Sequence, residues 1–301
     1  MNMANKNDKS RRSFLQKLGI AGASTVAGSA LLLQGCSDSN KASGNKVKVL
    51  TADNKLVEVD VAHLKPGDKI QDLSYLQKRG REGIPGKKFV MVVDLAKCKN
   101  ARKCMKACQS AHQLKPEMHH LNVLEMEDPV KKTSYWMPKT CQHCDNPPCV
   151  SVCPVDATFK RQDGIVLIDN ERCIGCRFCV AACPYSARTF NWTEPKNSDK
   201  MADVTYDMEL NVPQKKGTVT KCAFSADQLR HGKLPYCVSA CPNGVYYFGD
   251  QNEDLVTNGT TKKTVRLSHL LEENAAYTLM PELGTKPSVY YLPPREDNGK
   301  V

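Results

Sequence analysis

Fourteen of the fifteen cysteines fall into four short groups, and these thiols are the residues best able to do chemistry in this chain. In chain order the groups are Cys98, Cys104 and Cys108; Cys141, Cys144, Cys149 and Cys153; Cys173, Cys176, Cys179 and Cys183; and Cys222, Cys237 and Cys241. The third group, CIGCRFCVAACP, has the C-x2-C-x2-C-x3-C-P spacing of bacterial iron–sulfur ligands, in which the fourth cysteine binds the neighbouring cluster. The spacing therefore predicts iron–sulfur clusters.

Two other uses of the thiols stay open on spacing alone. Disulfides suit exported proteins, and structural zinc suits C-x2-C pairs separated by longer spacers. Neither requires the repeated triplet spacing, so iron–sulfur ligation is the favoured interpretation.

Because the fourth cysteine crosses to the next cluster, the groups act in pairs. The adjacent second and third groups are expected to form two [4Fe–4S] sites: Cys141, Cys144 and Cys149 with Cys183, and Cys173, Cys176 and Cys179 with Cys153. The first and fourth groups are then expected to pair around them: Cys98 and Cys104 with Cys241, and Cys222 and Cys237 with Cys108.

Short strands and turns are predicted to position these groups. Residues 89 to 94 (FVMVVD) indicate a strand that leads into the first group, and residues 163 to 167 indicate a hairpin between the second and third. Residues 46 to 61 alternate apolar and polar side chains, which predicts a β-hairpin. A helix is expected near residues 267 to 276, and the tail that ends in YYLPP is expected to pack in an extended form.

The remaining polar residues offer no catalytic set. There is no c-type haem attachment motif, phosphate loop, dinucleotide fingerprint or Ser/His/Asp arrangement. His143 lies inside the second group and is expected to form a hydrogen bond near a cluster, whereas His119 and His120 are expected in a surface loop. The chain is therefore predicted not to be an enzyme by itself.

The first residues have the features of an export signal. Residues 10 to 17 (SRRSFLQK) form a twin-arginine motif, followed by a Gly/Ala-rich apolar stretch from Leu18 to Leu33. A retained transmembrane helix is the alternative, which the short, small-residue composition disfavours. The segment LQGC resembles a lipobox that would be acylated at Cys36, with ordinary cleavage nearby as the alternative. We expect the protein on the periplasmic side of the cytoplasmic membrane, with membrane contact through lipid or a partner.

The charge balance is a weaker indication of partners. The formal net charge is +11 and the pI is near 8.9, which nucleic-acid binding could explain. Lysine and arginine are spread along the chain without interleaved aromatic residues, so an acidic protein partner is favoured and nucleic acid is not expected.

From about Lys87 to Leu292 the chain resembles the four-cluster ferredoxin-type subunits of membrane-associated respiratory oxidoreductases. Such subunits serve molybdopterin enzymes for tetrathionate, thiosulfate, polysulfide or dimethyl sulfoxide, and they have relatives in nitrite reduction. The resemblance rests on the segments CQHCDNPPCVSVCPVDATF, DGIVLIDNERCIGCRFCVAACPYSAR, GKLPYCVSACP and LGTKPSVYYL. It implies an α+β fold of two bacterial-ferredoxin-like βαβ modules, one inserted in the other, with the same pairing of the groups.

Five parts of the chain are expected on this basis. They are the signal at 1–36, a tether and hairpin extension at 37–86, an outer module at 87–135 plus 196–250, an inner module at 136–195, and a C-terminal helix and tail at 251–301.

The outer module departs from the family at one position in each of its two groups. Ala101 and Ser225 stand where the family has the second cysteine, so each outer site keeps three thiols. Three thiolates without a fourth suit a [3Fe–4S] cluster, and two [4Fe–4S] plus two [3Fe–4S] clusters are the leading hypothesis. A Ser225 oxygen that holds a fourth iron is one alternative, and an outer module without clusters is another.

The resemblance implies an electron-transfer subunit of an anaerobic respiratory complex. Its partners would be a molybdopterin-type catalytic subunit and a membrane quinone-reactive protein, either a multi-helix anchor or a cytochrome. Two alternatives remain: a lipid-anchored ferredoxin that serves multihaem cytochromes, and a scaffold that holds two clusters only.

Overall fold

The computed structural model describes residues 46–50, 56–60, 73–128, 132–196 and 204–294. The twin-arginine motif, Cys36 and the polar tether lie outside the described residues. The chain divides into two units, residues 1–70 and 71–301. Among the described residues, no helix has the length and apolar composition needed to cross a membrane.

In the first unit, strands β1 (Lys46–Leu50) and β2 (Leu56–Asp60) pair antiparallel, with Val47 opposite Val59. These two strands correspond to the hairpin that the alternating pattern predicts.

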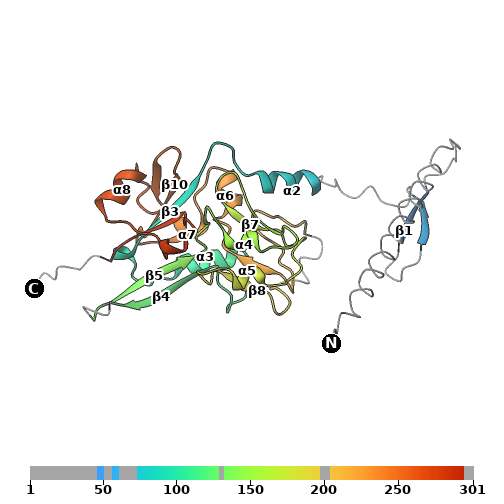
Figure 1. The fold of residues 1–301 in the computed structure, drawn as a ribbon, viewed down its shortest axis with the longest axis horizontal. Coiled ribbons are helices and arrows are strands. Elements are labelled where there is room, and N and C mark those ends of the chain that lie inside the picture. The colour runs from blue at the N-terminus through green and yellow to red at the C-terminus, as the bar shows by residue number, and fades with distance from the viewer. Residues whose placement is uncertain (1–45, 51–55, 61–72, 129–131, 197–203, 295–301) are drawn as a thin grey trace, which may run out of the picture. The chain divides into compact units, whose positions relative to one another are not determined.

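A five-stranded sheet forms the framework of the second unit (Figure 1). Its order is β12 (Thr264–Arg266), β11 (Leu255–Asn258), β10 (Tyr246–Asp250), β3 (Phe89–Asp94) and β13 (Val289–Leu292). Strand β3 is antiparallel to β10 and parallel to β13. The predicted first strand and the predicted extended tail are thus neighbours in one sheet.

The apolar run of β3 follows from its interior place in this sheet. Val90 and Val92 belong to one hydrophobic cluster, and Met91 and Val93 belong to another, because successive side chains point to opposite faces. A strand covered on both faces needs a continuous apolar sequence. The strand that ends just before the first cysteine group is therefore held from both sides.

The remaining elements of this unit are short. The helices are α2 (Leu73–Glu82), α3 (Lys103–Ala111), α4 (Pro148–Ser151), α5 (Phe178–Ala181), α6 (Ala226–Arg230), α7 (Tyr236–Ala240) and α8 (Leu267–Glu273), with 3-10 turns at Leu95–Lys97 and Pro281–Leu283. The other strands form antiparallel pairs: β4 (Leu121–Glu127) with β5 (Ser134–Thr140), β6 (Thr158–Lys160) with β7 (Val166–Ile168), and β8 (Arg188–Phe190) with β9 (Val219–Lys221).

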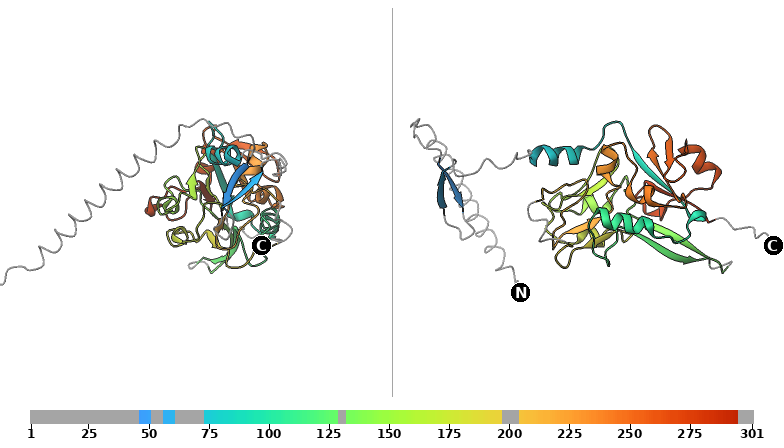
Figure 2. Two further views of the ribbon diagram at one scale, coloured as in Figure 1. Left: turned by 90° about the vertical axis from the view of Figure 1, so that its right-hand side faces the viewer. Right: turned by 180° about the vertical axis from the view of Figure 1, so that it is seen from behind.

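Several of these elements test the sequence interpretation. The predicted hairpin near residues 163 to 167 is present as β6–β7, and the predicted helix near residues 267 to 276 is α8. The sequence interpretation does not predict helix α2 or the long β4–β5 hairpin. The hairpin extends as an arm in Figures 1 and 2. Neither element carries a cysteine, so the motif spacing contains no information about them.

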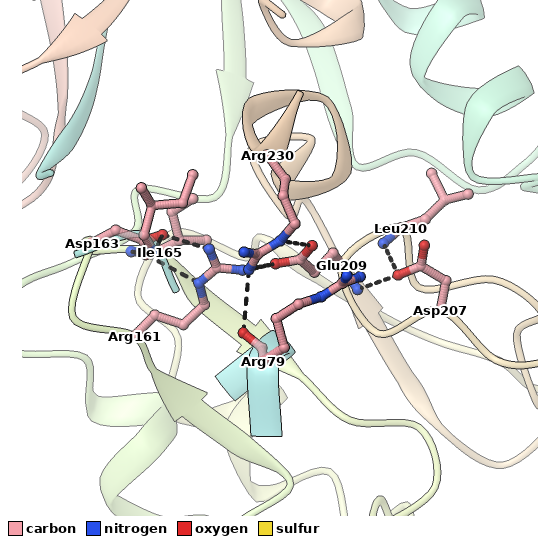
Figure 3. A network of polar contacts seen from close by, with 9 residues as sticks. Arg79, Arg161, Asp163, Ile165, Asp207, Glu209, Leu210 and Arg230 are labelled. Atoms are coloured by element: carbon pink, nitrogen blue, oxygen red, sulfur yellow. Dashed lines mark hydrogen bonds and ion pairs between the residues drawn. The ribbon is translucent and has the colours of Figure 1, made fainter. Parts of the chain in front are cut away.

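A buried network of charges joins α2, the β6–β7 turn, the loop at Glu209 and α6 (Figure 3). Both carboxylate oxygens of Asp163 accept hydrogen bonds from Arg161. Arg161 also donates to Glu209 at 2.7 Å, and the Glu209 carboxylate accepts from Arg230 at 2.6 Å. The side chain of Arg161 is fully buried, so its positive charge depends on these two carboxylates.

We expect Glu209→Ala to lower the free energy of unfolding by about 3 kcal/mol, because it leaves buried arginine charge partly unpaired. Denaturant unfolding of the cluster-loaded protein measures this loss. Glu253→Ala is the control, since Glu253 is half exposed and pairs with Lys87 at the surface, where no measurable loss is expected. Equal losses in the two variants would contradict the role assigned to the network.

Candidate metal centres

Cysteines from different groups lie around common cavities in the second unit. Three cavities are lined by Cys141, Cys144, Cys149 and Cys183; by Cys153, Cys173, Cys176 and Cys179; and by Cys98, Cys104 and Cys241. In the fourth set, burial raises the pKa of the Cys108 thiol well above its usual range, and the nearby Cys222 and Cys237 raise it further. The structure thus brings together the same four sets of thiols that the spacing of the cysteines predicts.

Tight left-handed turns precede two of the helices that carry the thiols. Arg102 (φ 52°) comes directly before α3, which carries Cys104, and Arg177 (φ 63°) comes directly before α5, which carries Cys179. The thiols on either side of each left-handed residue line one cavity: Cys98 and Cys104 in one case, and Cys176 and Cys179 in the other.

Gly175 is required by a close contact between two segments. It has φ +72°, and a Cβ at this position would approach the carbonyl oxygen of Gly217 to 2.1 Å. Only glycine fits both the backbone conformation and the contact. The loop between Cys173 and Cys176 is thereby held against the segment that leads into β9.

Burial favours protonated thiols when no metal is bound. Burial raises the pKa of Cys144 to about 12, with a further contribution from Cys141. Burial also raises the pKa of Cys104 and Cys149. Iron binds the thiolate, so binding of metal must displace these protons.

Two buried cations lie near the thiols and have no carboxylate partner among the described residues. Arg188 is 6 % exposed and Lys221 is 1 % exposed. Burial acts to lower the pKa of Arg188, but the charges of Cys149 and Cys179 outweigh it and hold the pKa above its usual value. The Lys221 ammonium donates to two backbone carbonyl oxygens, one of them that of Cys222.

This charge arrangement fits anionic clusters. An isolated buried cation is strongly unfavourable, so lysine and arginine are rarely buried without a partner. Thiolates around iron supply the missing negative charge, whereas disulfides do not. Backbone amides add hydrogen bonds to sulfur, from Thr158 to Cys153 and from Phe224 to Cys222, each at 3.4 Å. The residues present therefore fit iron–sulfur clusters.

The cysteine at the surface is Cys176. Among the fourteen described cysteines it is the one that is exposed. Ile174 and Phe178, which lie two residues before and after it in the sequence, are 64 % and 60 % exposed. The set that contains Cys176 thus has a thiol at the surface, flanked by exposed apolar side chains.

The two outer sites differ at the position of the missing cysteine. Ala101 lies in the wall of the cavity lined by Cys98, Cys104 and Cys241, and it offers no donor atom. Ser225 is 6 % exposed, and its hydroxyl oxygen accepts a hydrogen bond from the Tyr236 amide at 3.2 Å.

One prediction about the histidines is wrong. His120, in the bend directly before β4, is 4 % exposed and therefore not at the surface, because its ring packs 5.0 Å from that of His112; His119 is half-buried. His143 is buried, and its ring stacks on Phe224 at 3.7 Å and accepts a hydrogen bond from the Val166 amide.

Sequence reasoning also missed the buried cations. Nothing in the sequence marks Arg188 or Lys221 as buried, since both residue types usually keep their charged ends in water. The one available signal is position: Lys221 directly precedes Cys222, and Arg188 follows Cys183 by five residues.

Comparisons with known proteins agree with the chemistry of the thiols. A family model described as a 4Fe-4S dicluster domain matches residues 132–208. The B subunit of the selenate reductase of Mesobacillus selenatarsenatis is 36 % identical over 309 residues, which cover 96 % of this chain and 100 % of that protein.

Two further relatives are similar over shorter regions. The B subunit of the tetrathionate reductase of Salmonella typhimurium is 35 % identical over 70 % of this chain and 74 % of its own length. The iron–sulfur cluster-binding subunit of the menaquinone reductase of Nitratidesulfovibrio vulgaris is 36 % identical over 69 % of this chain and 90 % of its own length.

We expect Arg188→Met to lower the reduction potential of both inner centres by roughly tens of millivolts, because a buried positive charge beside Cys149 and Cys179 is lost. Redox titration followed by electron paramagnetic resonance measures this shift. Arg172→Met is the control, since Arg172 precedes Cys173 but is half exposed. An equal shift in the control would remove the special role of Arg188.

Proposed function

The chain belongs to the 4Fe-4S dicluster iron–sulfur subunits of molybdopterin-type reductases, and we propose that it carries electrons between a molybdopterin catalytic subunit and a membrane quinone-reactive partner. Its part in such a complex is electron transfer and not substrate conversion. The observation that carries the proposal is the gathering of the grouped thiols into four sets within one unit, which suits stepwise transfer between several centres.

The proposed cofactors follow from the number of thiols in each set. The two inner sets, with four cysteines each, would hold [4Fe–4S] clusters. The set of Cys98, Cys104 and Cys241 would hold a [3Fe–4S] cluster, because Ala101 cannot bind iron. The remaining outer set, which includes Cys108, would hold a three-iron cluster or a completed four-iron one. Bound clusters supply one-electron transfer, and the chain binds, spaces and tunes them.

The proposed arrangement is an inner ferredoxin-like module inserted in an outer one. Strand β3 precedes the first cysteine group and β10 follows the fourth, and the two strands pair. The second and third groups and the β6–β7 hairpin come between them in the chain. Pairing of the flanking strands supports the view that residues 136–195 are an insertion.

The proposed partners rest on the relatives and on the exposed thiol. Two relatives are named as B subunits of reductases, and a third as a menaquinone reductase subunit. The exposed Cys176 and its apolar neighbours offer a place for a partner to approach a centre closely. A membrane anchor or cytochrome and a molybdopterin subunit are therefore the proposed partners.

Iron and acid-labile sulfide per chain, measured on protein purified without oxygen, test the proposed centres. We expect about 14 or 15 irons per chain, with the paramagnetic signal of at least one oxidised three-iron cluster. A content of about 8 irons without that signal would leave only the inner centres and favour the two-cluster scaffold.

We expect Ala101→Cys to convert the cluster of its set to the four-iron form, because it restores a fourth thiolate. The three-iron signal of the oxidised protein should fall by about one spin per chain. Ala101→Ser is the control, and the signal should persist in it because a serine hydroxyl keeps its proton. An unchanged signal in Ala101→Cys would show that another set produces it.

The proposed location is the periplasmic side of the cytoplasmic membrane, with a lipid on Cys36. Replacing both Arg11 and Arg12 by lysine should retain the protein in the cytoplasm, and Cys36→Ser should release it from the membranes of cells that lack the partners. Cell fractionation and detection of a bound lipid measure both outcomes, with Ser37→Ala as the control. Continued membrane attachment of Cys36→Ser would contradict the lipid anchor, and normal export of the lysine variant would contradict the signal.

A further inference from the structure

A buried cluster of metal-ligating side chains lies beside the outer set that has Ser225 in place of a cysteine. The Sγ atom of Cys108 and one ring nitrogen each of His112 and His120 lie within 4.8 Å of one another, and all three residues are buried. Cys108 and His112 are four residues apart, so they share one side of α3 and its C-terminal end. Both histidines are therefore candidates to interact with a cluster bound at Cys108.

The hydrogen bond of His112 defines which of its nitrogens is available. Its Nδ1 lies 2.6 Å from the carbonyl oxygen of Leu210, and a carbonyl only accepts, so Nδ1 carries a proton. The nitrogen left to bind metal is Nε2. A backbone carbonyl behind the ring is a usual support of a histidine that binds metal, because it orients the ring and holds the proton on the other nitrogen.

The Leu210 carbonyl that orients His112 belongs to a loop that is itself held in place. The amides of Leu210 and Glu209 both donate to one oxygen of Asp207, at 3.2 and 2.8 Å. The side chain of Glu209 is bound by Arg161 and by a second arginine in the network of Figure 3. The ring of His112 is thus oriented by a braced loop.

His112 also lies next to Tyr236, the residue whose amide contacts Ser225. The centre of its ring is 6.2 Å from that of Tyr236, in an edge-on arrangement. The Tyr236 amide donates to the Ser225 hydroxyl, and the next residue is the expected ligand Cys237. A serine hydroxyl must lose its proton to bind iron firmly, whereas a neutral imidazole binds as it is.

His120 is suited to a different role. Its Nε2 lies 2.7 Å from the hydroxyl oxygen of Thr220, which accepts from the Asn211 side chain at 3.0 Å. In the tautomer in which the Thr220 hydroxyl donates its proton to Nε2, Nδ1 of His120 carries the ring proton. That Nδ1 is buried without a hydrogen-bond partner among the described residues. In that tautomer it is a donor to a cluster sulfur and not a ligand.

We propose that Nε2 of His112 is the fourth protein ligand of the cluster bound by Cys108, Cys222 and Cys237, and that this cluster is of the four-iron type. The inference rests on the proposed function, because it requires a cluster in this set. A neutral imidazole replaces an anionic thiolate here, so the cluster carries one negative charge less than with four cysteines. Its reduction potential is therefore higher than that of the same cluster in a chain with Ser225→Cys and His112→Ala.

The test uses the full-length protein loaded with iron and labelled with 15N only in histidine. In the reduced protein, pulsed electron paramagnetic resonance should detect a 15N coupling of the strength typical of nitrogen bound to cluster iron. In the oxidised protein, the three-iron signal should amount to about one spin per chain, from the Cys98 set. Both measurements use the unmodified chain, so neither depends on whether a variant folds.

Variants separate ligation from packing. His112→Ala should abolish the 15N coupling and raise the three-iron signal to about two spins per chain. His119→Ala is the control: it removes a half-buried ring that pairs with Gln109 outside the cluster of metal-ligating side chains, and it should leave both the coupling and the single spin in place. Loss of the coupling in His120→Ala but not in His112→Ala would overturn the assignment to His112.

The outcomes also distinguish this inference from the proposed function. About 14 irons, two three-iron spins and no 15N coupling in the unmodified protein would refute the ligand role of His112 and leave the four-centre electron carrier intact. About 8 irons per chain would refute the four-centre carrier itself, and with it the cluster that His112 would bind.

Discussion

The burial of positive charge beside the cysteines is the constraint on which the second unit depends. Arg188 and Lys221 have their charged ends inside the protein, among thiols and backbone carbonyls, with no carboxylate beside them in the described part of the chain. The thiols around them are equally unfavourable as isolated anions, since burial raises the pKa of Cys149 and Cys222. Bound iron would resolve both difficulties at once, because it stabilises the thiolates and the thiolates neutralise the cations. Folding and cluster insertion are thus expected to be coupled.

The sheet and the charge network give this interior a rigid boundary. Strand β3 ends just before the first group and β10 begins just after the fourth, so their pairing brings together two segments separated by about half of the chain. The carboxylates of Asp163 and Glu209 hold Arg161 between the β6–β7 hairpin and the Glu209 loop. Sites built on such braced elements keep their geometry more precisely than sites on loose loops, which suits centres that exchange electrons.

The same framework explains why the two incomplete sets are unlike each other. Ala101 is in a cavity wall and offers no atom that replaces a thiol. Ser225 receives a hydrogen bond from the first residue of α7, and the Leu210 carbonyl orients His112 beside that residue. On our proposal, the loss of the second cysteine in each motif leads to different chemistry, because the two positions have different neighbours in space.

By itself, the sequence determined the grouping of the cysteines, the strand at residues 89 to 94, the β6–β7 hairpin and helix α8. These features depend on spacing and periodicity within a few residues, which the chain carries locally. Only the tertiary structure decided that Arg188, Lys221 and His120 are buried, and that His112 lies beside Cys108 and Tyr236. Burial and contact between distant segments arise from packing of the whole unit, and the residue types involved are more often found at the surface.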